Sequence, residues 1–439
     1  MRLYGLGEWS LWEDEETTIF FSHHPDRRFP RIFPIFFVLL GWLYNVTGVS
    51  VLAGRLLAAT FGILSLALTY LVARRFAGDR VALAALVLVA VSPGHLFWSQ
   101  SIRYYGLALC LQLASIWMLL EATRRLTPVL SIASTVTLAL AVATHISALL
   151  LLPVQAAYLV WLSWSGGVRG RRGVTIAVAA ASLAALALSR LNRTTNVMAA
   201  SKAYVSSTGV DPMHLVMTGV LYFGLPAVAL AVIGAWRVKG SRSPTAVFFV
   251  LLGLGLPAGL VALTFLKSIN VTYYYGLVAL VGASVLAGHG IDWVATRGRA
   301  TITAVVLACA AFYVPVLAAY YGAAYGDRPR WRDAGPLIVQ AQSSDPGLPV
   351  FAQVPGVIAF YLGVPPDQTM GHPSVTGWPP EGGVLGQRGL YVFEDRLLTG
   401  APRQQLEQAC TLLGRVDSRM LVRDRAVVVY LCGAPSESM

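Results

Sequence analysis

The chain has 439 residues, of which 56% are hydrophobic and only 12% are charged. Soluble domains carry about 25% charged residues, so this composition argues against a soluble enzyme, a disordered chain or a nucleic-acid-binding domain. The formal net charge of +12 is better interpreted as membrane topology, because Lys and Arg mark the cytoplasmic ends of membrane spans. The four cysteines form no CxxC pair, so the sequence shows no zinc or redox motif.

Residues 1–49 are expected to form a first outer loop with an acidic motif and an interfacial helix. We expect no cleavable signal peptide, because the opening MRLYGLGEWSLWEDEETT is polar and acidic. Residues 33–47 are apolar but short of the roughly 20 residues that a span needs. Trp42 and Tyr44 suit a helix that lies in the outer interface. The alternative, an ordinary span, would move every later loop to the other side.

Ten apolar stretches follow that can cross a membrane if some of them tilt or extend slightly. They are residues 50–73, 81–98, 106–122, 128–144, 146–164, 174–189, 214–236, 244–266, 276–295 and 301–323. Five short basic loops between them contain Arg74, Arg75, Arg80, Arg124, Arg125, Arg169, Arg171, Arg172, Arg237, Lys239, Arg242, Arg297 and Arg299. The positive-inside rule places these loops in the cytoplasm. We therefore predict an α-helical polytopic protein of the cell membrane with about ten spans in residues 50–325.

The tail, residues 326–439, is predicted to be a small extracytoplasmic α/β domain. The β-like runs LPVFAQV, GLYVFED and RAVVVYLC alternate with helical stretches such as RQQLEQACTLL. Cys410 and Cys432 lie in a compartment where disulfides persist. They are expected either to form a disulfide, contributing about 3 kcal/mol in the chain-entropy model, or to pack as free thiols. Cys110 and Cys309 fall within apolar spans and should behave as buried hydrophobes.

The acidic run at residues 13–16 stands out, because carboxylates are scarce in the apolar region. A carboxylate at a membrane surface can act as a general base on a hydroxyl or amine. The plainer interpretation is a solvated loop, or a helix N-terminus where acidic side chains are favoured. His23 and His24 follow the run. Adjacent residues do not share a helix face, so the two histidines alone do not define a metal site, although the nearby acids are compatible with a divalent metal.

Positive charges on the outer side form the second unusual feature, and Arg103 is the sharpest case. It lies in SQSIRYYG, at a tight turn between two spans. A guanidinium there can hold a phosphate with two parallel hydrogen bonds, whereas the alternative is an arginine that snorkels to lipid headgroups. His145, in VATHISALLLLP, either binds substrate or caps a helix.

These features, in this order, resemble the polytopic GT-C glycosyltransferases that use polyprenyl-phosphate sugars, such as protein O-mannosyltransferases and lipid A aminoarabinose transferases. The resemblance rests on LYGLGEWSLWEDEETT, PRIFPIFFVLLGWLYNVTGVSVLAGRLLAATFG, YLVARRFAGDRVALAALVLVAVSPGHLFWSQSIRYYGL, ATHISALLLLPVQ and RWRDAGPLI. It covers roughly the whole chain and is most specific in residues 4–145. Two departures stand out: relatives begin with a spanning helix ahead of the acidic loop, and often carry Arg-Tyr before a late span.

The resemblance implies roles for particular residues. Asp14 and Glu15 take the place of the catalytic acidic pair, with Asp14 as the base. The donor phosphate would be bound by Arg103, Tyr104, Arg27, Arg28 and Lys267, the last substituting for the late Arg-Tyr. Substrate-binding candidates are His145, Trp12 and Tyr273. The resemblance assigns no metal ligand and no definite cofactor, and a divalent metal is compatible with it.

The function implied is an inverting transferase that moves a sugar from a polyprenyl phosphate to an acceptor hydroxyl at the outer face. Mannose is the first candidate sugar, and the acceptor is a protein, a glycolipid or a polysaccharide. Membrane lipids are further partners, and nucleic acid is not. The alternative is a transporter or a flippase for lipid-linked sugars; transporters tend to show inverted repeats and charges near the midplane, and the sequence displays neither.

Overall fold

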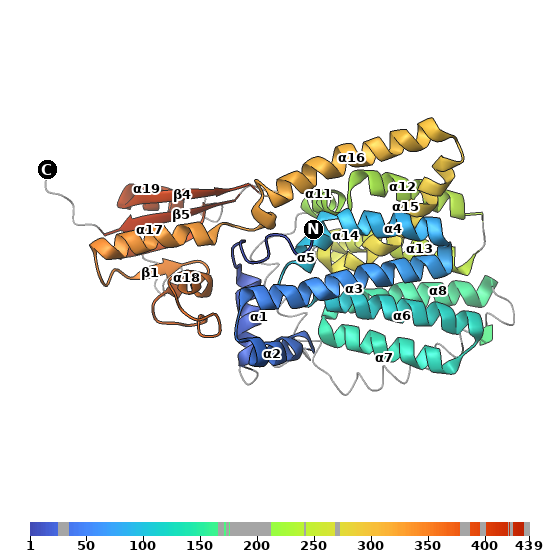
Figure 1. Ribbon diagram of the computed structural model, residues 1–439, viewed down its shortest axis with the longest axis horizontal. Helices are drawn as coiled ribbons and strands as arrows, with labels where there is room; N and C mark the ends of the chain where they lie inside the picture. The colour runs from blue at the N-terminus through green and yellow to red at the C-terminus, as the bar shows by residue number, and fades with distance from the viewer. Residues whose placement is uncertain are drawn as a thin grey trace.

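The computed structural model describes residues 1–24, 35–165, 171–172, 175, 212–240, 243–267, 273–377, 387–395, 401–419, 421 and 425–433. The molecule is elongated, with a bundle of long helices at one end and a small sheet domain at the other (Figure 1). The short helix α1 (Glu13–His23) lies where the two parts meet. This arrangement brings the acidic run beside both the bundle and the tail.

Long apolar helices form the bundle, as the composition predicts. The helices without a sharp bend are α3 (Val51–Ala77), α6 (Tyr105–Arg125), α7 (Pro128–Thr144), η2 (Ile146–Leu150) with α8 (Leu151–Ser165), α13 (Pro244–Val250) with η3 (Leu251–Gly255) and α14 (Leu256–Lys267), α15 (Leu277–Ala295) and α16 (Arg299–Tyr321). Within the described residues, six helices are long and apolar enough to cross a membrane, or up to eight if each bent pair counts as one span. The predicted polytopic helical class is confirmed. Every predicted stretch coincides with helix except 174–189, which apart from Thr175 lies outside the described residues.

Two predicted spans are not continuous helices but sharply bent pairs, and these bends were not predicted from the sequence. Residues 81–98 divide into α4 (Asp79–Val91) and α5 (Pro93–Ser99), which meet at 67°. Pro93 lacks an N–H and disfavours helical geometry at the preceding residue; Ser92 is accordingly extended (φ −64°, ψ 121°).

Residues 214–236 divide into α11 (Pro212–Phe223) and α12 (Leu225–Val238), which meet at 87° around Gly224. Its φ of +95° favours glycine.

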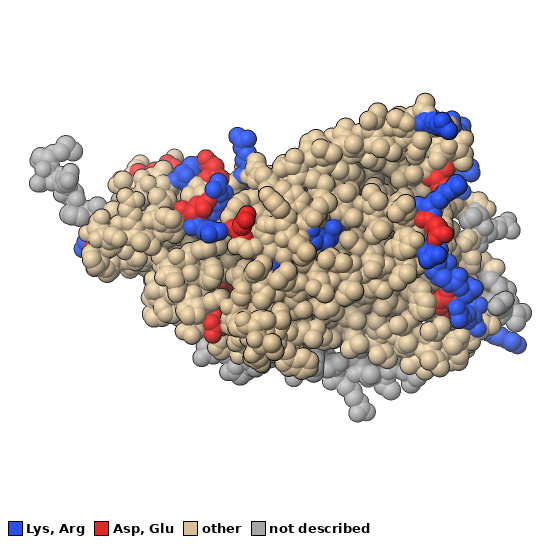
Figure 2. Space-filling model, in the orientation of Figure 1, with Lys and Arg blue, Asp and Glu red and all other residues tan. Residues whose placement is uncertain are grey.

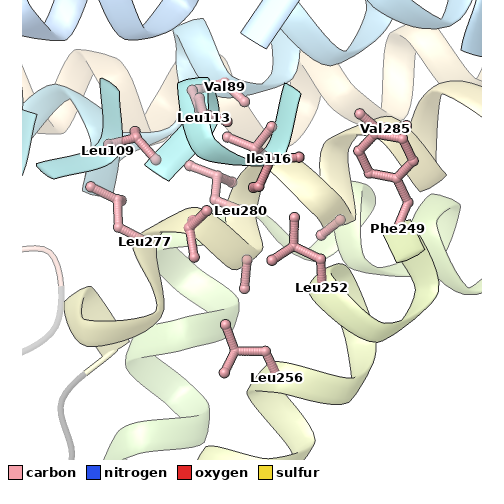
Figure 3. Close-up of a cluster of buried hydrophobic side chains, with 14 of the residues drawn as sticks. Val89, Leu109, Leu113, Ile116, Phe249, Leu252, Leu256, Leu277, Leu280 and Val285 are labelled. Atoms are coloured by element: carbon pink, nitrogen blue, oxygen red, sulfur yellow. The ribbon is translucent and has the colours of Figure 1, made fainter. Parts of the chain in front are cut away.

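The core of the bundle is apolar and centres on α15, whose residues are mostly buried. Figure 3 shows side chains of α4, α6 and α15 meeting those of the segment 249–256. Small residues allow the closest approaches: a Cβ on Gly234 would lie 1.8 Å from the Leu286 carbonyl oxygen, and one on Gly290 would lie 2.3 Å from that of Leu230. Close backbone approach through small residues is a common way of packing membrane helices. It fixes α12 firmly against α15.

The helix α2 (Ile35–Thr47) has 13 residues, too few to cross a bilayer at 1.5 Å per residue. Trp42 is 65% exposed, as an interfacial residue would be. Tyr44 is instead only 2% exposed and packs beside Gly54 of α3. The prediction that Tyr44 faces the interface was therefore wrong.

The tail domain is built on a five-stranded sheet in the order β2-β1-β3-β5-β4. The strands are β1 (Val350–Ala352), β2 (Thr376–Gly377), β3 (Gly389–Glu394), β4 (Cys410–Ser418) and β5 (Arg425–Cys432), with helices α17 (Trp331–Ser344), α18 (Pro355–Tyr361) and α19 (Ala401–Ala409). The pairs β2 with β1 and β1 with β3 are parallel, whereas β5 runs antiparallel to β3 and to β4. The small α/β domain expected from the alternating pattern is present.

The expected disulfide joins Cys410 to Cys432, whose Cα atoms lie 4.3 Å apart. The two residues face each other across β4 and β5. The prediction that Cys410 lies in a helix was wrong, because α19 ends at Ala409 and the following residues pair with β5. The bond therefore links two strands. Of the remaining cysteines, Cys110 is buried as expected and Cys309 is partly exposed.

One buried carboxylate joins the tail to the bundle. Asp327 lies just after α16, accepts a hydrogen bond from the Tyr222 hydroxyl of α11, and accepts another from the Leu421 amide at 2.9 Å. Burial raises its pKa to about 6, although the Leu421 amide and two nearby arginines act in the opposite direction. The folded protein therefore favours the protonated form of Asp327 more than the unfolded chain does.

This shift predicts a pH dependence. Between about pH 4 and pH 6 the folded state binds more protons than the unfolded one, so stability falls by up to roughly 3 kcal/mol as pH rises. Asp327→Asn keeps an acceptor for Leu421 and offers an N–H to Tyr222, so it should raise the melting temperature above pH 6 and flatten its pH profile. Thermal unfolding of purified protein between pH 4 and 8 measures this. The control is Asp417→Asn, on the same domain and 74% exposed; equal profiles for both variants would contradict the prediction.

Candidate functional site

Helix α1 separates its four acidic residues into different surroundings. It begins at Glu13, after an extended Trp12 (φ −129°, ψ 165°), and acidic side chains in a first turn are favoured by the positive end of the helix. Successive side chains point about 100° apart. Consequently Glu15 and Glu16 are buried, whereas the side chain of Asp14 is 40% exposed. The two residues predicted as a catalytic pair thus occupy different environments.

Glu15 lies in a fully buried ion pair with Arg55 of α3. Arg55 donates from Nε to Oε1 at 2.9 Å and from Nη2 to Oε2 at 2.6 Å, and the Ile102 amide donates to Oε1 at 2.9 Å. Burial by itself raises the pKa of Glu15, but the charge and hydrogen bonds of Arg55 outweigh it and lower the pKa below its usual value. Arg328 adds a second positive charge, with its Nε 3.9 Å from Oε2. Glu15 is therefore an ionised residue held between two arginines.

Arg55 and Arg328 organise the surroundings of α1, mainly through contacts with backbone carbonyls. Arg55 also donates to the carbonyls of Leu6, Trp9 and Ser10 at 2.7–3.0 Å. Arg328 donates to the Gly326 and Gln100 carbonyls and to the Ser101 hydroxyl, at 2.7, 3.0 and 2.6 Å. Because both side chains are fully buried, their hydrogen bonds fix the N-terminal loop against α3 and the turn before α6.

Glu16 connects α1 to the tail. Its Oε1 accepts a hydrogen bond from the Thr369 hydroxyl at 2.6 Å, and a Cβ on Gly356 would lie 2.3 Å from the same oxygen. Burial raises its pKa above the usual value. Nearby, the Leu11 amide donates to the Tyr361 hydroxyl at 2.7 Å. The tail therefore holds α1 from the side opposite the bundle.

Arg103 lies in the turn between α5 and α6, as predicted, and points at α1. Its Nη1 donates to the Asp14 carbonyl and the Thr18 hydroxyl, both at 3.0 Å, and its Nη2 donates to the Tyr104 hydroxyl at 2.8 Å. The Asp14 carboxylate is 3.5 Å from Nη2. The side chain of Arg103 is 11% exposed, which places the guanidinium at the margin of the site beside the half-exposed Asp14.

An aromatic cluster extends from Arg103 towards the bundle. The guanidinium lies 4.5 Å from the Tyr104 ring centre, and Tyr104 stacks on His145 with ring centres 4.6 Å apart. His145 also contacts Tyr105 at 4.9 Å and Tyr275 at 5.8 Å. Burial and then the charge of Arg103 lower the pKa of His145 to about 3. His145 is therefore a neutral imidazole that also caps η2 through the Ser147 amide.

Trp12 lies in a second group of rings beside this cluster. Its ring centre is 5.6 Å from that of Phe97 and 6.1 Å from that of Trp98, which in turn contacts Tyr105 at 4.2 Å. The indole Nε1 of Trp12 is buried and has no hydrogen-bond partner within the described part of the chain. An indole N–H in this position is available to an acceptor on a ligand.

Some sequence candidates fall outside what the structure describes. Arg27 and Arg28 lie in the segment 25–34, outside the described residues. Lys267 ends α14 and Tyr273 begins η4 (Tyr273–Gly276), but neither side chain is described. Among the described residues, no group of three or more His, Cys, Asp and Glu side chains is arranged to hold a metal ion. His23 and His24 instead stack on Tyr44 and Phe20.

Three contributors to the candidate site, Arg55, Arg328 and Tyr275, were not predicted from the sequence. Arg55 could have been found, because a lone charge in an apolar run is expensive and usually has a specific partner. Arg328, which follows the last span, and Tyr275 offered no comparable signal. Their role depends on contacts with residues far away in the chain.

An apolar cavity opens in the bundle near this aromatic cluster. It has a volume of about 220 Å³ and is lined by α11, α12, the segment η3–α14 and α15, including Gly219, Leu260 and Gly276. Gly276 directly follows Tyr275, the residue that contacts His145. One lining residue of the cavity is thus next in sequence to a member of the aromatic cluster.

Comparison with known proteins identifies the architecture. The fold is similar to that of ArnT from Cupriavidus metallidurans bound to undecaprenyl phosphate, with a TM-score of 0.58 and 16% identity over 99% of this chain and 96% of that one. For the apo form of the same protein, the TM-score is 0.55 and the sequence identity is 15%, over 98% of this chain and 95% of that one. The fold is also similar to that of the oligosaccharyltransferase AglB from Archaeoglobus fulgidus in complex with an inhibitory peptide and a dolichol-phosphate. The TM-score is 0.54 and the sequence identity is 14%, over 86% of this chain and 63% of that one.

The chain therefore has the GT-C fold, which the sequence resemblance predicted. No protein-family model matches the sequence, and no curated protein sequence matches it. Identities near 15% show a shared architecture, so the chemistry must be argued from the site itself.

Proposed function

We propose that the protein is an inverting glycosyltransferase that moves a sugar from a polyprenyl phosphate to an acceptor hydroxyl. Asp14 accepts the hydroxyl proton while the acceptor oxygen attacks the anomeric carbon. The bond from that carbon to the phosphate oxygen breaks, and its electron pair leaves with the polyprenyl phosphate. Arg103 stabilises the charge that develops on the departing phosphate. Fixed positive groups near developing negative charge stabilise such transition states.

The observation that carries this proposal is the contact between Asp14 and Arg103. A half-exposed carboxylate and a positioned guanidinium, 3.5 Å apart, offer a proton acceptor and a phosphate ligand in one place. Glu15 would serve to position α1, because its oxygens are already occupied by Arg55 and Ile102. The neutral His145 and the indole N–H of Trp12 are suited to hydrogen-bond or stack on the sugar.

The apolar cavity is suited to the isoprenoid chain of the donor. It lies among helices long enough to span a membrane, and its lining residue Gly276 directly follows Tyr275, which contacts His145. A lipid phosphate at Arg103 could therefore extend its tail towards the cavity. The neighbours ArnT and AglB are described with undecaprenyl phosphate and a dolichol-phosphate, which supports a donor of this class. Mannose is the first sugar to test, followed by aminoarabinose, arabinose and glucose.

The direct test uses purified full-length protein in lipid nanodiscs. It is given each polyprenyl-phosphate sugar with peptide, glycolipid and polysaccharide acceptors, and release of polyprenyl phosphate is measured. We expect release with one donor, dependent on acceptor, and an inverted configuration in the product. A transporter or flippase would release none with any donor while still moving the lipid-linked sugar between leaflets.

We further propose that the site faces the outer side of the plasma membrane. Figure 2 shows Lys and Arg gathered at the end of the bundle farthest from the sheet domain, where α3, α6, α12 and α15 end. Positive charge collects on the cytoplasmic side of membrane proteins. The opposite end, with α1 and the tail, would then be extracytoplasmic, where a disulfide persists.

Cysteine labelling in intact cells tests this orientation. A membrane-impermeant thiol reagent is expected to modify Ser344→Cys in the tail and to leave Ala300→Cys, beside the basic loops, unmodified until the cells are opened. Both positions are exposed, and the unsubstituted protein gives the background. Labelling of Ala300→Cys alone in intact cells would reverse the proposed orientation.

Filling the apolar cavity should weaken use of the donor. Gly219 lines the cavity, and a Cβ there meets no atom within 4 Å. Gly219→Phe is expected to raise the donor KM about 10-fold, as loss of a few buried methylene contacts would do. Gly259→Phe is the matched control, because Gly259 is equally open but does not line the cavity. Equal KM values for both variants would place the isoprenoid chain elsewhere.

A further inference from the structure

A second cavity, of about 350 Å³, lies at the end of the bundle opposite to the candidate site. It is lined by the ends of α3, α12 and α15 and the start of α13, and its polar lining includes Arg237, Thr245, His289 and Asp292. No residue described for the candidate catalytic site contributes to it. Because α12 and α15 are locked together through Gly234 and Gly290, the cavity is held by a rigid helix pair.

Two arginines are arranged around Trp293 at this cavity. Arg237, which lines it, has its guanidinium 5.6 Å from the Trp293 ring centre, and Arg297 lies 4.6 Å from the same ring. Neither arginine forms an ion pair with a carboxylate within the described ranges. An aromatic ring contacts the flat face of a guanidinium and so orients it. The N–H groups lie in the plane of the guanidinium and stay available for an anion.

The other charges nearby leave the cavity positive. Among the described residues that line the cavity, Asp292 is the only carboxylate. Its Oδ1 lies 3.8 Å from Nη1 of Arg80, a residue of α4. Elsewhere at this end, each carboxylate is also engaged: Glu121 pairs with Arg75, Arg124 and Arg125, and Asp79 pairs with Arg74. The positive charges of Arg237 and Arg297 are therefore not balanced by the nearby carboxylates, which pair with other arginines.

The cavity also lies beside the surface of the bundle that lipids would contact. Trp236, next to Arg237, is 64% exposed and packs edge-on against Trp293 with ring centres 6.1 Å apart. Exposed tryptophans of this kind are typical of the headgroup level of a membrane. A ligand in the cavity could thus bring a phosphate to the arginines while its acyl chains lie along the outside of α12.

We infer that this cavity is a binding site for the phosphodiester headgroup of an anionic membrane lipid, held by Arg237 and Arg297. Basic pockets between spans on the cytoplasmic side bind such headgroups, and guanidinium pairs well with phosphate oxygens. The site is separate from the proposed donor site, and the inference does not depend on the proposed sugar transfer.

Native mass spectrometry of the full-length protein, delipidated in a neutral detergent, tests the inference. Phosphatidylglycerol and phosphatidylcholine with identical acyl chains are titrated in turn. We expect phosphatidylglycerol to bind about 10-fold more tightly, and Arg237→Gln to remove about 10-fold of its affinity, as loss of a charge-assisted contact implies. The control is Arg299→Gln, an exposed arginine at the same end, which should retain its affinity within about twofold. Melting temperatures without lipid verify that both variants are folded.

Three results would overturn the inference. Equal binding of the two lipids would remove the requirement for an anion. Equal losses for Arg237→Gln and Arg299→Gln would indicate general attraction to a basic surface. Complete displacement of phosphatidylglycerol by inorganic phosphate would identify a soluble phosphate, and not a lipid, as the ligand.

Discussion

Asp14→Asn is expected to lower the rate of sugar transfer by about 10²–10⁴-fold, the usual contribution of a general base. Asparagine keeps the size of the side chain but accepts a proton poorly. Folding should survive, because Arg103 donates to the backbone carbonyl of residue 14, which the substitution retains. Turnover of polyprenyl-phosphate sugar by purified variants measures the effect, and melting temperatures confirm the fold.

Two substitutions on the same helix make this experiment specific. Glu13→Gln removes a neighbouring exposed carboxylate and should leave turnover nearly normal. Glu15→Gln leaves Arg55 buried without its charge partner, so it should destabilise the protein by about 3–5 kcal/mol. A well-folded but inactive Glu15→Gln with an active Asp14→Asn would transfer the role of base to Glu15. Normal turnover in both, and in the double variant, would rule out a base in this motif.

Arg103→Ala should reduce kcat/KM for the donor by about 10²–10³-fold, the typical cost of removing one group that stabilises a developing oxyanion. Arg103→Lys should restore only part of this loss, because an ammonium cannot make two parallel contacts with a phosphate. The measurement is a donor titration at saturating acceptor. Arg103 also contacts Thr18 and Tyr104, so each variant needs a melting curve.

Arg332→Ala is the control for Arg103. Arg332 is an exposed arginine near the site, and its Nη1 donates to the Glu8 carbonyl at 2.9 Å. Its removal should change donor use by less than about twofold. Full rescue by Arg103→Lys would reduce the requirement to one positive charge, and an unchanged kcat/KM for the donor in Arg103→Ala would contradict a role for Arg103 in donor use.

The helical architecture was largely predictable, because an apolar block of sufficient length leaves the chain few alternatives in a membrane. The bends were harder to predict. Pro93 and Gly224 are visible in the sequence, but membrane helices often tolerate proline and glycine. Whether such a residue breaks the helix depends on neighbouring contacts. Here the Ser92 hydroxyl donates to the Tyr222 carbonyl at 2.6 Å and joins the two bends.

Part of the candidate site was predictable in its residues, but their arrangement was not. The acidic run, Arg103 and His145 were identified by their scarcity or by the family resemblance, and the structure brings them to one place. Which acid is buried depends on the rotation of α1, and that rotation is set by Arg55, Arg328 and Thr369. These partners lie up to 353 positions away in the chain, where no local pattern reports them.

The contacts between α1 and the tail also determine when the site can first exist. Leu11 and Tyr361 are 350 positions apart, and a ribosome adds about 5–20 residues per second. At that pace about 20–70 s separate synthesis of α1 from synthesis of the residues that complete its surroundings. Arg328, which faces Glu15, follows the last span α16. A nascent chain therefore exposes its acidic motif early, but can assemble the site only after the last helix of the bundle and the tail have been synthesised.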